Sequence, residues 1–204
     1  MPYSYDVFVS YRRANAWPRF VGETFLPMFR HWLGAELDAA PRIFFDADVI
    51  ETGDSWPHRL ADGIAGSKVL LCLWSREYFS SEWCLAELGH MLARRDAVGN
   101  GRPVPLPLVL AAVIHDGEDL PAELRSIQRY DIQQYANPWL AAGSSTAEEL
   151  SNRVRVLASH VASALRQAPE HDTGWRGLAT EEFIKLHRKR TLQRTVPSLG
   201  GDPA

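Results

Sequence analysis

The sequence lacks the features that mark several specialised classes of protein. It has only two cysteines, Cys72 and Cys84, without a Cys-x-x-Cys pair or a histidine at ligand spacing, so we expect no disulfide framework and no zinc site. No unbroken apolar run approaches the length of a membrane span, and the N-terminus shows no leader pattern. These absences predict reduced, buried thiols in a cytoplasmic protein with no membrane partner and no bound metal.

The sequence also lacks a net positive charge and glycine-rich phosphate-binding loops. The 22 Lys and Arg residues are outnumbered by 25 Asp and Glu, giving a formal net charge of −3, so no global basic field would attract nucleic acid. No G-x-G-x-x-G pattern follows the first predicted strand, and no Walker A sequence occurs. Any phosphate group would instead be bound by arginine side chains and backbone N–H groups.

The chain does contain enough apolar sequence for one good core. It has 204 residues, of which 46% are hydrophobic, and one domain is the expectation at this length. Near-continuous apolar runs are typical of strands that are covered on both faces, as in a parallel sheet. The predicted strands are Tyr5–Tyr11, Arg42–Asp46, Lys68–Ser75 and Pro107–Ile114, with a weaker fifth at Arg129–Tyr135.

Helical patterns lie between these strands. Apolar residues recur at three- and four-residue spacing from Phe25 to Leu37, where Pro27 should kink or interrupt the helix. Ser55 before Trp56-Pro57 reads as an N-cap, and Ser80 or Ser81 can cap the helix that follows. A last long helix, capped near Thr146, carries an apolar stripe formed by Leu150, Val154, Leu157, Val161 and Leu165. Alternating strands and helices predict a doubly wound α/β domain with right-handed crossovers.

The composition changes after the last helix, so we divide the chain into a domain at residues 1–167 and a tail at residues 168–204. The segment "TEEFIKLHRKRTLQR" could form a short basic helix. We interpret its basic cluster as a solvated face rather than a nucleic-acid or lipid site, because it carries no stacking platform. The cluster consists of Lys185, Arg188, Lys189, Arg190 and Arg194. It is equally plausible that the segment docks on this domain or on a partner protein through its apolar residues Phe183, Ile184 and Leu186.

Polar residues collect where the predicted strands end, which is where open parallel sheets bind ligands. The first strand ends in Ser10, Tyr11, Arg12, Arg13 and Asn15; the second in Asp46, Asp48, Glu51, Thr52 and Gly53; the third in Trp74, Ser75 and Arg76. The next helix contains Glu87. On a helical wheel Cys84, Leu85, Leu88, Met91 and Leu92 share one arc, whereas Trp83, Glu87, His90 and Arg94 share another. We therefore expect Glu87 beside the apolar stripe, either facing a cleft or as an ordinary surface carboxylate near His90 or Arg94.

Three stretches carry a resemblance to a known family. "YDVFVSYRR" from Tyr5, "FFDADVIETGDSW" from Phe44 and "SSEWCLAEL" from Ser80 resemble, in order and spacing, the signature stretches of the TIR (Toll/interleukin-1 receptor) domain. The resemblance covers about Tyr5 to Arg166 and implies a flavodoxin-like fold of five parallel strands. It also implies one of two activities, which are scaffolding by TIR–TIR association or cleavage of NAD⁺ at the nicotinamide–ribose bond. In the NAD-cleaving members the catalytic glutamate lies four residues after the tryptophan of the third stretch, a position that Glu87 holds here.

The chemistry of NAD⁺ cleavage suits a single carboxylate. Nicotinamide leaves as a neutral molecule, so no general acid is required, and one carboxylate can stabilise the charge that develops on the ribose. We expect Arg12 or Arg13, with Ser10, to bind the pyrophosphate and Tyr11 or Trp56 to stack on the substrate. Asp46, Glu51 and Trp83 complete the predicted substrate-binding set. The plainer alternatives are a solvated loop for the arginines and packing for Trp56. We expect Asp6 to be hydrogen-bonded at the start of the first strand rather than catalytic.

Two functions from different classes remain open. The first is an NAD⁺ glycohydrolase of a prokaryotic immune defence system that makes ADP-ribose or a cyclic isomer, with NAD⁺ as substrate and no cofactor. The second is a non-catalytic interaction module that associates through the loop Asp46 to Ser55. The predicted self-association residues are Asp48, Val49, Ile50, Glu51, Thr52 and Gly53. A phospho-acceptor domain that uses Asp46 and Asp48 is disfavoured, because the TIR-like loop after them does not fit it.

Overall fold

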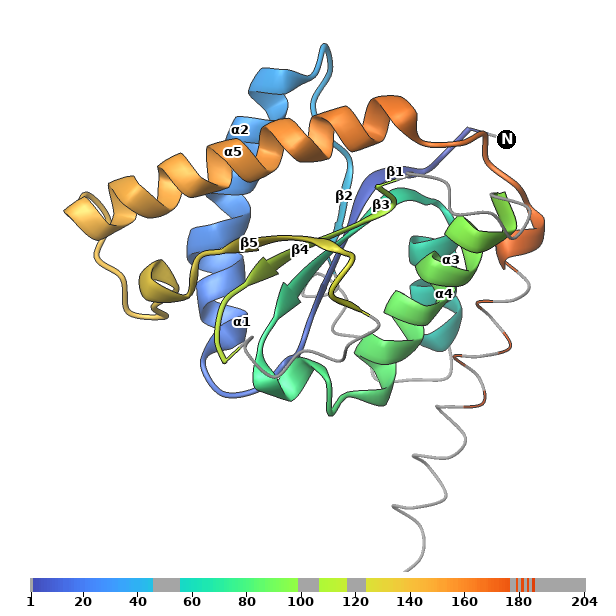
Figure 1. Ribbon diagram of the computed structural model, residues 1–204, viewed down its shortest axis with the longest axis horizontal. Coiled ribbons are helices and arrows are strands. Elements are labelled where there is room, and N and C mark those ends of the chain that lie inside the picture. The colour runs from blue at the N-terminus through green and yellow to red at the C-terminus, as the bar shows by residue number, and fades with distance from the viewer. Residues whose placement is uncertain are drawn as a thin grey trace, which may run out of the picture.

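Five parallel strands form the centre of the molecule (Figure 1). The computed structural model describes residues 2–45, 56–98, 107–116 and 124–176, together with residues 179, 181, 183 and 185. The strands are β1 (Tyr5–Tyr11), β2 (Ile43–Phe45), β3 (Ser67–Trp74), β4 (Val109–Val113) and β5 (Gln128–Asp131). Their order in the sheet is β2-β1-β3-β4-β5, and every neighbouring pair is parallel. The prediction of a doubly wound, flavodoxin-like parallel sheet is confirmed.

The buried strands explain why the apolar runs predicted them well. Every residue of β1 after Tyr5 is buried, and so is every residue of β4. The bounds of β1 match the prediction, whereas β4 is shorter than predicted, and β2 begins one residue later, with its predicted end at Asp46 outside the described residues. The weak fifth run forms an exposed edge strand at Gln128–Asp131 and then a 3₁₀ turn at Gln133–Tyr135, which explains its weak apolar signal.

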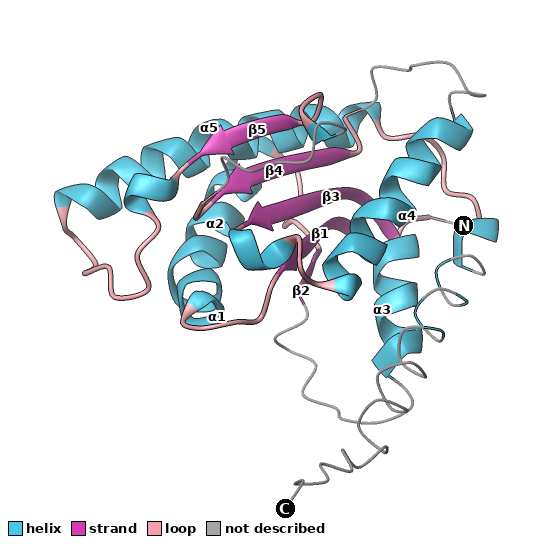
Figure 2. Cartoon of the chain, turned by 60° about the horizontal axis from the view of Figure 1, so that its bottom comes forward, coloured by secondary structure: helices cyan, strands magenta, loops and turns pink. Residues whose placement is uncertain are grey.

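Helices cover both faces of the sheet (Figure 2). On one face α2 (Leu26–Glu36) and α5 (Ser145–Gln167) pack on side chains such as Val7, Val9 and Leu71. On the other face α3 (Trp56–Ala65) and α4 (Glu82–Val98) pack on Phe8, Leu70 and Cys72. The cap of α5 is Ser144, whose side chain accepts a hydrogen bond from Ala147 N, so the predicted cap near Thr146 is wrong by two positions. No described helix is long and apolar enough to cross a membrane.

The first helical region shows how the chain accommodates Pro27. Helix α1 (Trp17–Arg19) continues into a π-helical turn (Phe20–Phe25) and then into α2, so the helix is not broken at the proline. The N–H of Leu26 bonds to the carbonyl of Val21, one residue further back than in an α-helix. Because proline supplies no N–H and its ring crowds the preceding turn, a wider turn directly before it is a physical remedy. The predicted interruption is therefore a change in helix type rather than a break.

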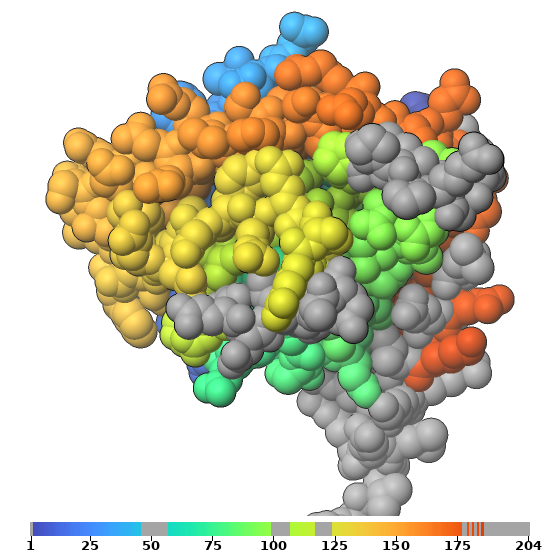
Figure 3. Space-filling model, viewed as in Figure 1, coloured from blue at the N-terminus to red at the C-terminus, as the bar shows by residue number. Residues whose placement is uncertain are grey.

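The segment after α5 packs on the α3/α4 side of the sheet. Trp175, Ala179 and Phe183 are buried, at 7%, 0% and 0% exposure, and the last two belong to the core beneath α3 and α4. Arg176 forms an ion pair with Asp62 of α3. In Figures 1 and 3 the described C-terminal residues lie on the same side of the molecule as α4. Phe183 thus docks on this domain, while Ile184 and Leu186 lie outside the described residues.

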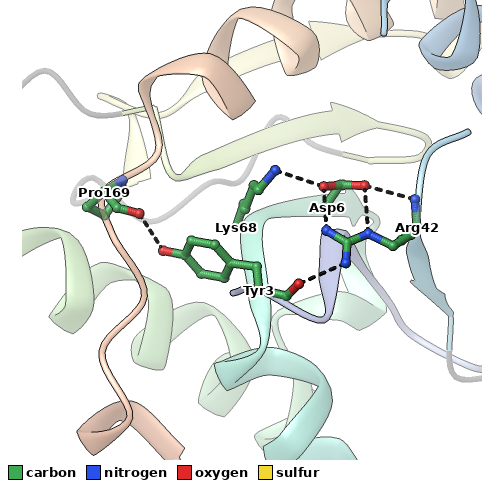
Figure 4. A network of polar contacts seen from close by, with 5 residues as sticks. All are labelled: Tyr3, Asp6, Arg42, Lys68 and Pro169. Carbon is green, nitrogen blue, oxygen red and sulfur yellow. Dashed lines mark hydrogen bonds and ion pairs between the residues drawn. The ribbon is translucent and has the colours of Figure 1, made fainter. Parts of the chain in front are cut away.

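A polar network joins the amino ends of the strands (Figure 4). Asp6 of β1 accepts hydrogen bonds from Arg42 N at 3.0 Å and from Lys68 Nζ at 2.9 Å. Tyr3 donates its hydroxyl to Pro169 O at 2.8 Å and so ties the segment after α5 to the same edge. Burial opposes ionisation, but the hydrogen bonds from Arg42 and Lys68 outweigh it and lower the pKa of Asp6. The structural role predicted for Asp6 is confirmed.

Candidate functional site

The candidate site forms where β1 passes beneath the start of α4. Side chains alternate along a strand, so Ser10 shares the face of Phe8 and points toward α4, in register with Cys72 of β3. Ser10 Oγ donates a hydrogen bond of 2.5 Å to Glu87 Oε2. An ionised carboxylate accepts stronger hydrogen bonds from a hydroxyl than a neutral acceptor does. The contact joins residues that are 77 positions apart in the chain and fixes Glu87 near the carboxyl edge of the sheet.

Helix α4 buries the polar arc that contains Glu87. Its buried residues are Cys84, Ala86, Glu87, Leu88, His90, Met91 and Arg94. At about 100° per residue, Glu87 lies in the middle of this arc. Only 7% of Glu87 is exposed, whereas Leu85 is 41% exposed. The prediction that Glu87 lies beside the buried stripe, with Leu85 inside it, is therefore wrong.

The start of α4 is fixed by a serine cap. Ser81 Oγ accepts a hydrogen bond from Cys84 N at 3.4 Å, and Ser81 O accepts one from Leu85 N at 3.0 Å. Of the two predicted caps, Ser81 is the one observed. Arg12 Nη1 also donates to Ser81 Oγ, at 3.4 Å, which places one of the two predicted arginines at the N-terminus of the helix that carries Glu87. Arg13 is exposed.

Within the described residues, hydroxyl and thiol groups lie around the Glu87 carboxylate. Ser10 Oγ lies 2.9 Å from the hydroxyl of Tyr78, and both residues are buried. Burial, reinforced by the charge of Glu87, raises the pKa of Cys72 to about 12. Burial likewise raises the pKa of Tyr78 well above its ordinary value and raises the pKa of Cys84. These hydroxyl and thiol groups therefore keep their protons at neutral pH and can orient a carboxylate without adding charge.

Of the three aromatic residues predicted to bind substrate, the two whose side chains are described lie in different places. Tyr11 is 7% exposed and stacks on Phe45, with ring centroids 5.4 Å apart, in the core on the α2/α5 face. It is separated from Glu87 by the sheet. Trp83 lies one helical turn before Glu87 and stacks on Phe183 at 5.6 Å with an interplanar angle of 8°. Trp83 is thus close to Glu87 along α4, and its ring already has an aromatic neighbour from the C-terminal segment.

Several predicted residues lie outside the described part of the chain. They are Asp46, Asp48, Val49, Ile50, Glu51, Thr52 and Gly53, with the cap Ser55. Helix α3 begins at Trp56, but its side chain is not described. The roles given to these residues in substrate binding and self-association stay predictions.

Sequence reasoning missed Tyr78. It belongs to a 3₁₀ turn (Arg76–Tyr78) directly after β3, and it is fully buried against Ser10, Cys72 and Cys84. One signal could have pointed toward it. Ser10 interrupts the apolar alternation on the α4 side of β1, and a buried hydroxyl requires polar partners. Within the described ranges, no group of three or more metal-ligating side chains comes together.

The strand order and the buried carboxylate define a flavodoxin-like α/β domain with an acidic group at the carboxyl edge of its sheet. A family model described as the TIR domain matches residues 7–144. The chain therefore belongs to the TIR domain family.

Plant and bacterial proteins are similar to part of the chain. It is 31% identical over 97 residues to "Probable disease resistance protein RPP1" of Arabidopsis thaliana, a match that covers 48% of this chain and 7% of that protein. It is 28% identical over 102 residues to "Probable 2' cyclic ADP-D-ribose synthase TcpB" of Brucella melitensis, which covers 50% of this chain and 37% of TcpB. The TIR domains of the activated Roq1 resistosome align over 92% of this chain and 99% of theirs, at 19% identity and a TM-score of 0.36.

Proposed function

We propose that this TIR domain cleaves NAD⁺ between nicotinamide and ribose, with Glu87 as the catalytic carboxylate. The observation that carries the proposal is the Glu87 carboxylate itself, buried at the carboxyl edge of the sheet and bound by Ser10 at 2.5 Å. The name of the relative TcpB, a probable cyclic ADP-ribose synthase, supports the same reaction class. The products are nicotinamide and either ADP-ribose or a cyclic isomer. We place the activity in prokaryotic immune defence.

The surroundings of Glu87 fit this chemistry. As the bond to nicotinamide breaks, positive charge develops on the ribose, and a fixed carboxylate stabilises it most when it has little freedom to reorient. The described hydroxyl and thiol neighbours of Glu87 keep their protons, so they can hold the carboxylate without cancelling its charge. Arg12, held near Ser81 at the start of α4, and Arg13 are the proposed ligands of the pyrophosphate.

The test is to incubate the purified protein with NAD⁺ and to separate nicotinamide, ADP-ribose and cyclic products by chromatography. Glu87→Gln keeps an oxygen that can accept the Ser10 hydroxyl, so the variant should stay folded while its rate falls by about 100-fold or more. The matched control is Glu82→Gln, which changes an exposed glutamate on the same helix and should leave the rate unchanged. A folded Glu87→Gln variant with the wild-type rate would show that Glu87 is not the catalytic carboxylate.

One observation favours the second candidate function, a non-catalytic TIR interaction module. Because Glu87 is only 7% exposed, its bond to Ser10 could serve packing alone. In that case the wild-type protein would release no nicotinamide, and Glu87→Gln would change only the free energy of unfolding. Measuring unfolding and product formation on the same preparations separates the two functions.

A further inference from the structure

A chain of buried hydroxyl groups ends on the Glu87 carboxylate. Ser10 Oγ lies 2.5 Å from Glu87 Oε2 and 2.9 Å from the Tyr78 hydroxyl. Tyr78 in turn lies 3.3 Å from both Cys72 Sγ and Cys84 O. Ser10 is 1% exposed and Tyr78 is 0% exposed, so water does not compete for these bonds.

Three parts of the fold bring this chain together. Strand β1 supplies Ser10, the 3₁₀ turn after β3 supplies Tyr78, and α4 supplies Glu87 and the carbonyl of Cys84. The parallel register sets Ser10 beside Cys72. Close packing on all sides leaves these side chains few alternative rotamers. The position of the carboxylate therefore depends on the two hydroxyls beneath it.

Counting protons gives the direction of each bond. An ionised carboxylate has no proton to donate, so the single hydroxyl proton of Ser10 goes to Glu87. Ser10 Oγ is then an acceptor for Tyr78, whose own single proton has its shortest acceptor there, at 2.9 Å rather than 3.3 Å. If Glu87 binds a proton, it can donate that proton to Ser10 Oγ. Ser10 then donates to the Tyr78 hydroxyl, and Tyr78 donates to Cys84 O. Both protonation states are hydrogen-bonded, but only the ionised state gains a charge-assisted bond.

We propose that Ser10 and Tyr78 are positioning residues that orient Glu87 and favour its ionised form, with Tyr78 acting through Ser10. This proposal rests on the proposed function, and it changes the role of Ser10. A hydroxyl whose only proton is donated to Glu87 has none left for a phosphate oxygen, so pyrophosphate binding falls to Arg12 and Arg13 alone.

The pH dependence of activity separates this role from a merely structural one. The titratable side chains facing Glu87 within the described residues are Cys72, Tyr78 and Cys84, and the charged group acting on this cluster is Arg12. Removing a donor to the ionised carboxylate disfavours that form, so more alkaline conditions are needed to keep it ionised. Ser10→Ala should therefore move the acidic limb of the kcat/KM profile upward by about one pH unit. It should also lower kcat by about 10- to 100-fold while KM changes by less than about threefold.

A double-mutant cycle tests whether Tyr78 acts through Ser10. Tyr78→Phe removes only the hydroxyl and should give a smaller shift of the acidic limb in the same direction. In the Ser10→Ala background the Tyr78→Phe substitution should have no further effect. Additive effects of the two substitutions on kcat would overturn the proposed order of the chain.

Matched controls lie near the amino edge of the sheet, at the start of β3 and just before β1. Ser67→Ala removes a fully buried hydroxyl from β3 that donates to Gly63 O at 2.6 Å, and Tyr3→Phe removes a hydroxyl bound to Pro169 O. Both should alter the free energy of unfolding without moving the acidic limb. If they move it as much as Ser10→Ala does, the effect reflects stability and the proposal is wrong.

A measurement without substrate keeps this proposal separate from the proposed function. Carbon-13 NMR titration of the Glu87 carboxyl, assigned by comparison with Glu87→Gln, follows its ionisation directly. The titration midpoint should rise by about one unit in Ser10→Ala and by less in Tyr78→Phe. Unchanged midpoints would overturn the positioning role even in an active enzyme. Raised midpoints in a protein that leaves NAD⁺ intact would support it while the proposed function fails.

Discussion

His90 shows how burial sets the charge of a single residue. It is 6% exposed on α4, and its Nε2 has no hydrogen-bond partner within the part of the chain that the structure describes. Burial, with the nearby positive charge of Arg94, lowers the pKa of His90 to about 4. The imidazole is therefore neutral in the folded protein at neutral pH, because burial disfavours its charged form.

This lowered pKa makes the stability of the protein depend on pH. The unfolded chain binds a proton at His90 near the ordinary pKa of 6.5, whereas the folded chain binds it only near 4. As pH falls between these values the unfolded state gains the proton first, so His90 should reduce the free energy of unfolding by about 3 kcal/mol. His90→Leu should remove this part of the loss. Urea unfolding of both proteins at several pH values in that window measures the difference.

The difference between the two proteins isolates His90 from other titrating groups. Burial also lowers the pKa of His171, so part of the wild-type pH dependence should persist in His90→Leu. Parallel stability curves for the two proteins would contradict the burial of a neutral imidazole. Asp6 affects stability only at lower pH. The pKa of its carboxyl group is lowered from the ordinary 3.8, so its stabilising contribution is lost only as the pH falls below that value.

The elements of the fold were predictable to different degrees. Apolar runs predicted β1 and β3 well. Both strands are buried on both faces, so nearly all of their side chains are apolar and form a continuous run in the sequence. The exposed edge strand β5 and the π-helical turn before Pro27 left weaker signals, because neither is specified by apolar alternation. The contact between Ser10 and Tyr78 depends on the register of β1 with β3, which a single sequence does not fix.

Helix α4 gives the clearest case in which local periodicity failed. The wheel placed Trp83, Glu87, His90 and Arg94 outside the apolar stripe, yet the last three are buried. Part of the cover comes from the distant C-terminal segment, since Phe183 stacks on Trp83 and Trp175 lies 3.8 Å from the Arg94 guanidinium. A helical wheel reports only the residues of its own helix. It could not include a partner from more than eighty residues further along the chain.

The C-terminal segment should therefore stabilise the domain. Phe183 is fully buried, so Phe183→Ala should lower the free energy of unfolding by about 3–5 kcal/mol through lost apolar burial and a residual cavity. The matched control is Trp139→Ala, because Trp139 is 69% exposed and its removal should change little. Chemical denaturation of the three proteins gives both values. Equal stability of Phe183→Ala and the wild type would show that the segment does not pack on α4 in solution.

At the scale of the whole molecule, we predict that activity requires self-association through the loop Asp46 to Ser55. Its sequence sets the apolar Val49 and Ile50 among acidic residues, a pattern that a neighbouring subunit could cover. A contact between this loop and a different surface of the next copy is heterologous and extends into filaments unless the rotation closes. Specific activity should therefore rise with protein concentration, and Ile50→Asp should suppress that rise by placing a charge in the contact. A dilution series of the NAD⁺ cleavage assay measures this.

The control for this prediction is Val156→Asp, which introduces the same charge at a residue of α5 that is 47% exposed. It should leave the concentration dependence unchanged. Specific activity that stays flat on dilution, in the wild type and in Ile50→Asp alike, would mean that each monomer is a complete enzyme.

The path of the C-terminal segment also decides where a protein can be tagged. Trp175 lies against Arg94, near the amino edge of the sheet, whereas Phe183 lies against Trp83, one turn of α4 before Glu87. The chain thus crosses the molecule from the edge that holds Tyr3 to the edge that holds the candidate site. A fluorescent protein or affinity handle joined before Tyr3 is tethered far from Glu87, and one joined after Phe183 is tethered close to it. Handles for purification belong before Tyr3, and a reporter meant to sense the site belongs directly after Phe183.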